Sequence, residues 1–201
     1  KKVNWVIEAD IKGFFDHVDH GWMLKCLEEK IGDTPFKKLI ERMMKSGVME
    51  GGQYSASKEG TPQGGIISPI LANIYLHYIL DLWFEKVERK GLRGEAYLIR
   101  YADDFVICMQ HREEAQKVLE DLKKRLQKFG LELAEDKTGI VEFGRFAEEN
   151  YKRRGQGKPG TLDFLGFTHY CTRTRDGRFK VRMKTNRIKM NKAICGMWKW
   201  I

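Results

Sequence analysis

Two apolar runs, residues 97–99 and 105–109, flank the sequence Tyr101-Ala102-Asp103-Asp104. Short apolar runs on either side of a polar reversal are typical of a β-hairpin, so this stretch restricts the fold to one that contains a sheet. Two adjacent carboxylates at such a turn repel each other unless a positive charge lies between them, and a metal ion commonly supplies that charge. A solvated turn is the alternative, because Asp is common in turns for purely local reasons.

The rest of the chain predicts helices and strands in alternation. Alternating apolar residues indicate a half-buried strand at residues 3–11, with Glu8 and Asp10 on the face opposite the aliphatic set. Apolar residues at helical spacing predict core helices at about 19–30 and 34–46, a centrally buried helix at 68–90 and an amphipathic helix at 112–129. We further expect a weak hairpin at 47–60, strands at 131–133, 140–143 and 162–170, a surface loop at 144–160, a hairpin turning at Asp176-Gly177, and a basic helix from Asn186.

This order of elements predicts an α+β fold, with a largely antiparallel sheet and helices on one face. The length of 201 residues suits one domain with an appendage. No apolar run approaches the roughly 20 residues that span a bilayer, and no signal peptide is evident at the N-terminus. The four cysteines lack paired spacing, which favours reduced thiols. From these features we expect a soluble, intracellular (cytoplasmic) protein without a membrane partner.

Positive charge is concentrated at the C-terminal end. Residues 151–201 hold 14 Lys or Arg against only Asp163 and Asp176, a net charge of +12, whereas residues 1–150 carry a net charge of −3. Such a field predicts a polyanionic partner, nucleic acid before membrane, because no basic helix with a broad apolar face accompanies it. A merely soluble basic tail is the alternative.

Carboxylates occur at two strand ends: Asp10 after the first strand, and Asp103-Asp104 at the hairpin turn. If the first strand lies beside the hairpin, the three carboxylates converge on one edge of the sheet. Two Mg²⁺ ions could bridge them there, and such a pair supports in-line displacement at phosphorus.

Five motifs resemble, in order, those of a group II intron-type reverse transcriptase, over about residues 4–170. They are residues 10–16 (Asp-Ile-Lys-Gly-Phe-Phe-Asp), 60–65 (Gly-Thr-Pro-Gln-Gly-Gly) with 68–73 (Ser-Pro-Ile-Leu-Ala-Asn), 101–104, 131–138, and 164–167 (Phe-Leu-Gly-Phe). The resemblance implies a polymerase palm at residues 1–185 and the start of a thumb helix at 186–201. It also implies RNA-directed DNA synthesis on an RNA template from a DNA primer and dNTPs.

The resemblance assigns a role to each matching residue. Asp10 and Asp103 would be the principal metal ligands, assisted by the Ile11 carbonyl and Asp104, with Mn²⁺ as an alternative to Mg²⁺. Lys137 would stabilise departing pyrophosphate and donate a proton, and Phe15 would exclude a ribose 2′-OH. The other expected nucleotide contacts are Gly13, Phe14, Gln63 and Gly64. The expected primer and template contacts are Tyr101, Phe164, Leu165, Gly166, Lys180 and Arg182.

Ordinary packing or solvation is the alternative for several of these residues, Phe15, Lys137 and the two Phe of residues 164–167 among them. Neither the five histidines nor the Met pair at 43–44 forms a recognisable site. Oligomeric state is not indicated.

Other functions share parts of this pattern. RNA-dependent RNA synthesis uses the same metal geometry but typically has Gly before the Asp pair and a polar residue in place of Phe15. A non-catalytic maturase that binds group II intron RNA would need only the basic segment. CRISPR-associated and diversity-generating reverse transcriptases share the palm, and an unrelated α+β binding protein would require five coincident motifs. Because fingers and most of a thumb are missing from the sequence, we expect this polypeptide alone to be feeble or inactive.

Overall fold

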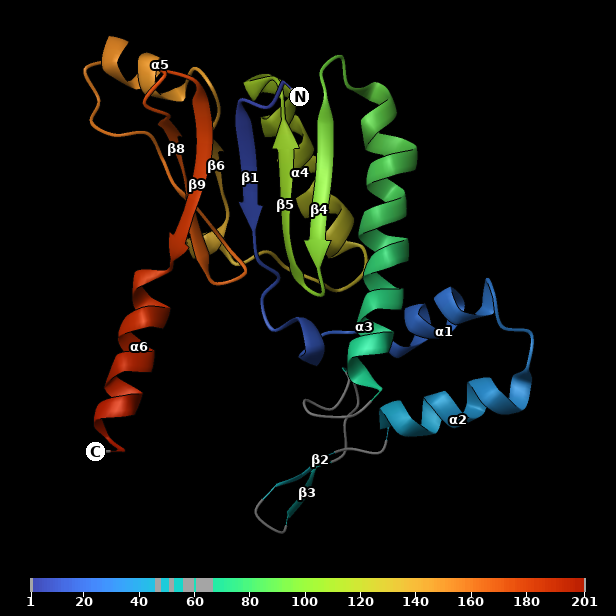
Figure 1. Ribbon diagram of the computed structural model, residues 1–201. Helices are drawn as coiled ribbons and strands as arrows, with labels where there is room; N and C mark the ends of the chain where they lie inside the picture. Colours follow the sequence, from blue (N-terminus) through green and yellow to red (C-terminus); the bar gives the residue numbers. More distant parts are fainter. Residues whose placement is uncertain (1, 46–47, 51–52, 56–59, 61–66, 201) are drawn as a thin grey trace.

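The computed structural model describes residues 2–45, 48–50, 53–55, 60 and 67–200. A four-stranded antiparallel sheet, in the order β4-β5-β1-β6, forms its centre (Figure 1). Its strands are β1 (Trp5–Ala9), β4 (Ala96–Tyr101), β5 (Asp104–Met109) and β6 (Gly139–Glu142). The predicted hairpin at residues 101–104 is therefore confirmed, and β1 lies beside it.

The first strand is buried on both faces, so the prediction of a half-buried strand is wrong. Ile7 is fully buried in the main core, which the helices cover. Val6 points to the other face and is 1% exposed, in a second cluster with Val106 and Leu162. That cluster lies against a three-stranded sheet formed by β7 (Leu162–Phe164), β8 (Phe167–Arg173) and β9 (Phe179–Thr185).

Between β1 and the β4–β5 hairpin, the chain first forms two helices, α1 (His20–Glu28) and α2 (Thr34–Lys45). A short hairpin of β2 (Val48–Glu50) and β3 (Gln53–Ser55) follows them. In α1, the Asp19 carboxylate accepts a hydrogen bond from the Trp22 N–H at 2.7 Å, as an N-cap does. The second helix, α2, buries Ile40 and Met44. The same helix leaves three apolar side chains 42–47% exposed, so it is only partly a core helix: Phe36, Leu39 and Met43.

One long helix runs along the helical face of the sheet. It begins as α3 (Ser68–Leu76) and continues through two π-helical segments, η2 (His77–Asp81) and η3 (Phe84–Glu88), to a 3₁₀ turn, η4 (Arg89–Gly91). Tyr75, Leu80 and Phe84 are fully buried, which confirms the predicted central helix. The burial is not complete all round, since Ile70 and Val87 are about 60% exposed. The amphipathic helix α4 (Arg112–Gln127) packs beside it.

The C-terminal third departs most from expectation. Residues 131–133 form no strand but one isolated bridge, Ile11 to Leu133. The expected loop at 144–160 contains the helix α5 (Ala147–Arg153). The expected strand at 162–170 reverses direction at Leu165-Gly166, where both residues have positive φ. The hairpin at Asp176-Gly177 and the helix after Asn186, α6 (Arg187–Trp198), are confirmed.

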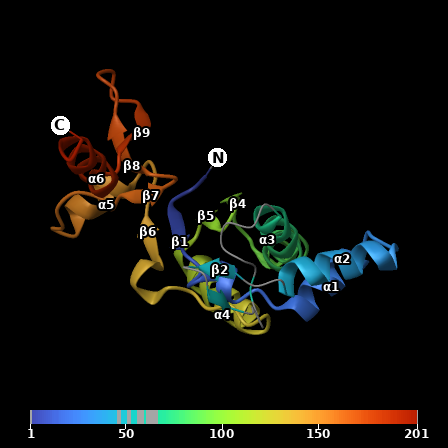
Figure 2. The same cartoon turned by 90° about the horizontal axis from the view of Figure 1, so that it is seen from below.

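Seen from below, β7–β9 and α6 lie on one side of the central sheet and α1 and α2 on the other (Figure 2). The mixture of helices with antiparallel sheets confirms the α+β class. A domain boundary at residue 186 stays a prediction. Within the described residues, no helix is both long and apolar enough to cross a membrane.

Candidate functional site

The predicted carboxylates come together at one end of the central sheet. In the antiparallel register of β1 and β5, Ala9 lies opposite Phe105. Asp10, the next residue after β1, therefore lies opposite Asp104, the first residue of β5. Tyr101 pairs with Asp104 and closes the hairpin around the two-residue loop of Ala102 and Asp103. The backbone topology alone thus gathers Asp10, Asp103 and Asp104 at this edge.

The charges of this cluster act on each other. Partial burial, then the charges of Asp103 and Asp10, raise the pKa of Asp104 above its ordinary value of 3.8. Lys189 and Lys137 oppose that rise. Three carboxylates therefore face two lysines, an excess of negative charge that a divalent cation would neutralise.

Lys137 lies at the cluster because its segment is hydrogen-bonded to the end of β1. The Ala134 N–H donates to the Asp10 carbonyl at 2.8 Å, and Lys137 belongs to the 3₁₀ turn η5 (Glu135–Lys137) that follows. Its Nζ lies 2.7 Å from Asp10 Oδ2. The hydrogen bond to Asp10, more than any other influence, raises the pKa of Lys137, so the amine is held in its charged form.

The donor set fits a hard cation, although the side chains are not gathered around one. Carboxylate and carbonyl oxygens are the ligands that Mg²⁺ prefers, and Asp10, Asp103, Asp104 and the Ile11 carbonyl supply only these. Among the described residues, no three or more His, Cys, Asp or Glu side chains are close enough to hold one ion. Instead, the amine of Lys137 forms an ion pair with one carboxylate oxygen of Asp10. The metal site therefore stays a prediction.

The segment after Asp10 makes a tight reversal. Gly13 has φ +53°, a conformation that Gly adopts without penalty, and it precedes the 3₁₀ turn η1 (Phe14–Asp16). Phe14 is 2% exposed and packs in the core, so a nucleotide could reach only its backbone. Phe15 is partly buried, and its ring meets that of Phe14 edge to face at 5.3 Å.

Gly60, the first residue of the predicted nucleotide loop, is fixed directly beside Phe15. Its N–H donates to the Val18 carbonyl at 2.9 Å, and its carbonyl is hydrogen-bonded to the His20 ring at 2.5 Å. With φ +84° and a Cβ position only 2.6 Å from the Phe15 carbonyl, no other residue fits there. The sequence had indicated no role for His20. Gln63 and Gly64 lie outside the described residues.

The reversal between β7 and β8 shares a cavity of about 800 Å³ with Asp10 and Asp104. Among its lining residues are Asp10, Asp104, Lys137, Leu165, Gly166 and Lys189. Phe164 lines the same cavity, so three of the residues expected to contact the primer or template share it with Asp10 and Asp104. A second cavity, of about 830 Å³, adjoins Asp10, Ile11 and Gly13 on the side of α4.

Three expected nucleic-acid contacts line neither of these cavities: Tyr101, Lys180 and Arg182. Tyr101 is 69% exposed, and Lys180 and Arg182 are exposed on β9. The opposite face of β9 is open as well, because Met183 is 66% exposed. Contact of these residues with a template or primer stays a prediction.

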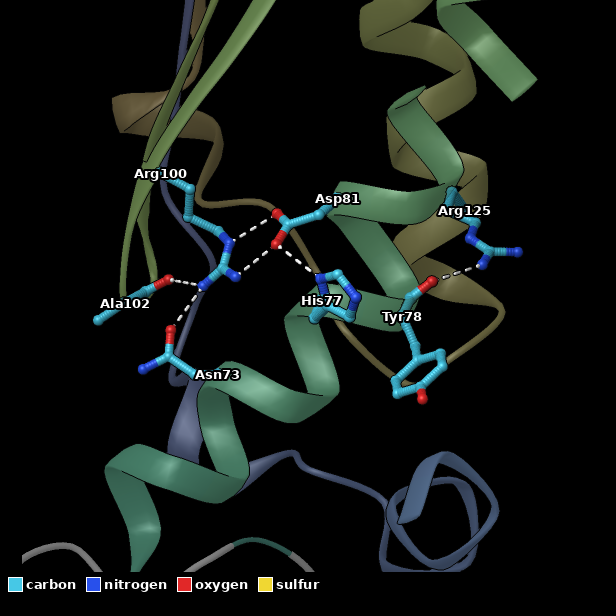
Figure 3. Close-up of polar contacts among 7 residues, drawn as sticks. All are labelled: Asn73, His77, Tyr78, Asp81, Arg100, Ala102 and Arg125. Carbon is cyan, nitrogen blue, oxygen red and sulfur yellow. Dashed lines mark hydrogen bonds and ion pairs between the residues drawn. The ribbon is translucent and has the colours of Figure 1, made fainter. Parts of the chain in front are cut away.

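Two functional candidates were missed from the sequence. Lys189 reaches the cavity from α6, and the basic character of that helix was its only signal. Arg100 donates hydrogen bonds to Asp81 and to the carbonyl of Ala102, the residue before Asp103 (Figure 3). A charged residue between the apolar residues of a strand, Ile99 and Tyr101, was the signal available for it.

The sequence profile of the family described as reverse transcriptase (RNA-dependent DNA polymerase) matches residues 1–169. The chain belongs to this family. Group II intron-encoded protein LtrA of Lactococcus lactis subsp. cremoris is 33% identical to this reverse transcriptase chain over 194 residues, covering 68% of the chain and 32% of LtrA. Protein YkfC of Escherichia coli (strain K12) is 31% identical over 186 residues, covering 76% of the chain and 49% of YkfC. The resemblance to the group II intron type is thereby confirmed.

Solved structures confirm the fold of this reverse transcriptase chain. Apo telomerase from Candida tropicalis, truncated from its C-terminal domain, superposes with a TM-score of 0.65 over 92% of this chain and 36% of that one, at 18% identity. Telomerase from Candida albicans, in complex with a fragment of telomeric RNA, superposes with a TM-score of 0.63 over 91% of this chain and 30% of that one, at 16% identity. At such identities the likeness concerns the palm fold alone. The chain spans about a third of the length of LtrA and about half of YkfC.

Proposed function

We propose that this chain is the palm of an RNA-directed DNA polymerase, which adds dNTPs to a primer 3′-OH as an RNA template directs. The observation that carries the proposal is the meeting of Asp10 with Asp103-Asp104 at the sheet edge, beside Lys137 and two cavities. Membership of the reverse transcriptase family supports it. The sequence identity with an intron-encoded protein favours a group II intron origin.

In this proposal Asp10, Asp103, Asp104 and the Ile11 carbonyl hold two Mg²⁺ ions, or Mn²⁺ in their place. Bound ions would acidify the primer 3′-OH and neutralise the charge on the departing pyrophosphate. Nearly all the remaining catalysis is positioning, which the rigid sheet edge supplies. With Asp10 engaged as a ligand, the charged amine of Lys137 would be free to stabilise the pyrophosphate and to donate a proton to it.

The proposal assigns substrate selection to the first two motifs, residues 10–16 and 60–65. The Gly60 position lies against the backbone carbonyls of Phe15 and Asp16, so the predicted nucleotide loop begins beside the Phe15 segment. The proposal gives Phe15 the exclusion of a ribose 2′-OH, and Gly13, Gln63 and Gly64 contacts with the nucleotide.

The proposal assigns the binding of primer and template to the C-terminal part of the chain. In the proposal, Leu165 and Gly166 contact the primer end in the cavity that they share with Asp104. Lys180 and Arg182 contact phosphates, which positions a duplex without reading its sequence. Because the relative LtrA is an intron-encoded protein, we extend the proposal to group II intron RNA as a partner and to a maturase role. An intracellular location is part of the same proposal, with which the four free cysteines agree.

Single-nucleotide extension of a DNA primer on a poly-rA template tests the proposal. The native chain should incorporate dTTP only with Mg²⁺ or Mn²⁺, even if slowly. Asp10→Asn should abolish incorporation and leave RNA binding unchanged, and the matched surface variant Asp176→Asn should have no effect. Incorporation that survives Asp10→Asn would contradict the site. A native chain that binds RNA but incorporates no dTTP with either ion would favour a non-catalytic RNA-binding role.

Discrimination between dNTP and rNTP tests the RNA polymerase alternative. Phe15→Val removes a bulky ring and should increase rUTP incorporation relative to dTTP about 10-fold or more, since a steric clash is worth at least ~1.4 kcal/mol. No gain of rUTP use would refute the role of Phe15. A native preference for rUTP would place the chain with RNA polymerases.

A further inference from the structure

Arg100 connects the turn that carries Asp103 to the long helix (Figure 3). Its Nε and Nη2 donate to the two carboxylate oxygens of Asp81 at 2.7 and 2.6 Å. Its Nη1 donates to Asn73 Oδ1 at 2.9 Å and to the Ala102 carbonyl at 2.8 Å. Only 12% of the Arg100 side chain is exposed, so water competes little for these charge-assisted bonds. We call Arg100, Asp81, Asn73 and the Ala102 carbonyl the Arg100 network.

The backbone that this network holds is strained. Ala102 has φ +53°, a left-handed conformation that costs a non-glycine residue about 1 kcal/mol or more. The Ala102 carbonyl belongs to the peptide that joins Ala102 to Asp103. A hydrogen bond to that carbonyl therefore fixes the peptide plane from which Asp103 leaves the turn.

The helix side of the network depends on a π-helical segment. Asn73 and Asp81 are eight residues apart, which in a regular α-helix places them roughly 80° apart around the axis. The segment η2 (His77–Asp81) has wider turns, so the rotation per residue is smaller and both side chains face Arg100 (Figure 3). On the other side of η2, Arg125 of α4 donates to the carbonyls of Ile79 and Tyr78, at 3.0 and 3.4 Å.

We propose that Arg100, oriented by Asp81 and Asn73, is a positioning residue that aims Asp103 before a metal ion binds. The inference rests on the proposed function, because it assigns Asp103 to the metal. In this role Arg100 acts through the turn and would touch neither metal nor substrate. Lysine could not replace it, because a single ammonium cannot span two carboxylate oxygens, an amide and a carbonyl with the planar fork of a guanidinium.

The test compares Arg100→Lys with Arg125→Lys in the full 201-residue chain. Mn²⁺ binding is measured by electron paramagnetic resonance without nucleic acid, and dTTP incorporation is followed over a Mg²⁺ titration. Arg100→Lys should weaken Mn²⁺ binding about 10-fold, as loss of an outer-shell contact does, and should raise the Mg²⁺ needed for half-maximal kcat with little change in the KM for dTTP. Arg125→Lys disturbs the same helix without touching the turn and should leave Mn²⁺ affinity unchanged.

A rescue separates positioning from general stability. Glycine adopts positive φ without the penalty of alanine, so adding Ala102→Gly to Arg100→Lys should recover part of the Mn²⁺ affinity. If Arg100→Lys does not fold, Asn73→Ala, which removes one bond to Arg100, should still weaken Mn²⁺ binding by a smaller factor. Native Mn²⁺ affinity in the Arg100 and Asn73 variants, or equal loss in Arg125→Lys, would overturn the inference. A native chain that neither binds Mn²⁺ nor extends a primer would overturn the proposed function itself.

Discussion

Two turns face each other across the candidate active site, and they resemble each other in backbone but not in support. Ala102 in the β4–β5 turn and Leu165 in the β7–β8 turn are the two non-glycine residues with positive φ in the described part of the chain, at +53° and +51°. Each is the first residue of a two-residue loop that closes an antiparallel hairpin. Strained backbone of this kind persists where surrounding contacts enforce it, and it clusters at functional sites.

The supports differ in rigidity. The Arg100 network ties the Ala102 turn to a helix whose inner face is in the main core. The Leu165 turn is held by a backbone hydrogen bond from the Asn186 N–H to the Gly166 carbonyl. Asn186 is the N-cap of α6, a helix that buries none of its residues. Regions with few buried contacts open and shift most easily. The turn with the carboxylates is therefore fixed, whereas the turn assigned to the primer can adjust together with α6.

Asparagine substitutions in the first turn should have the largest effect. Asp103→Asn should lower the rate of dTTP incorporation about 1000-fold, roughly 4 kcal/mol of transition-state stabilisation, because it removes a charged ligand of the proposed metal site. Asp104→Asn should cost clearly less, since the proposal gives its carboxylate only an assisting role. Rates under single-turnover conditions measure both, and primer–template affinity should stay unchanged in both. Equal losses would show that the turn does not aim one carboxylate in preference to the other.

The sequence predicted the features of these two turns that follow from local patterns, and it missed those that depend on contacts between distant residues. The meeting of Asp10 with Asp103-Asp104 was predictable, because period-2 strands and a polar turn determine which residues end a strand. The Arg100 network was not, because it requires Asn73 and Asp81 to share a face across a π-helical segment that no local pattern indicates. The reversal at Leu165 was missed because leucine rarely adopts positive φ.

Other misses had a usable signal. Residues 144–160 were predicted as a loop from their charge and glycine content, yet α5 contains two ion pairs at helical spacing, Glu148 with Lys152 and Glu149 with Arg153. Pairs of that spacing support a helix. The burial of both faces of β1 could not be predicted, because the second layer comes from residues more than 150 positions away.

Gly166→Ala should weaken the second turn and its contact with α6. A side chain at φ +83° costs about 1 kcal/mol, and its Cβ would lie 3.3 Å from the Lys189 side chain. We expect primer–template affinity to fall by up to about fivefold, the equivalent of ~1 kcal/mol, with little change in kcat. Fluorescence anisotropy measures the affinity. The matched control is Gly177→Ala, which has φ +75° in a turn with no neighbour near the Cβ. It should lose similar stability but no affinity, and equal affinity loss would contradict the assigned contact.

Asn186→Ala should loosen the start of α6. The Asn186 side chain accepts hydrogen bonds from the N–H groups of Ile188 and Lys189, at 2.9 and 3.3 Å, and donates to Asp163 at 2.8 Å. Loss of such a cap costs a helix about 1 kcal/mol. Amide hydrogen exchange should quicken in α6 and remain unchanged at residues 101–104. The control, Asp19→Ala, removes the corresponding cap of α1 and should affect that helix instead. Faster exchange at residues 101–104 in Asn186→Ala would mean that the two turns are coupled.

The smallest expected effect is that of the Asp104 carboxylate on the stability of the fold. Because the folded state raises the pKa of Asp104, the folded chain binds a proton more tightly than the unfolded chain does, and this carboxylate destabilises the fold increasingly as pH rises through and above 3.8. Asp104→Asn should therefore stabilise the metal-free chain at pH 7, by less than about 1 kcal/mol because the group is largely solvated. The gain should vanish below about pH 3.8, where Asp104 is protonated in both states.

Chemical denaturation at several pH values measures this gain in stability. Mg²⁺ at 10 mM, roughly the concentration needed to fill a weak carboxylate site, should reverse the order of stability of the two chains at pH 7. A gain that is independent of pH would mean that the carboxylates at this turn do not repel one another, and the case for a metal between them would lose its electrostatic basis.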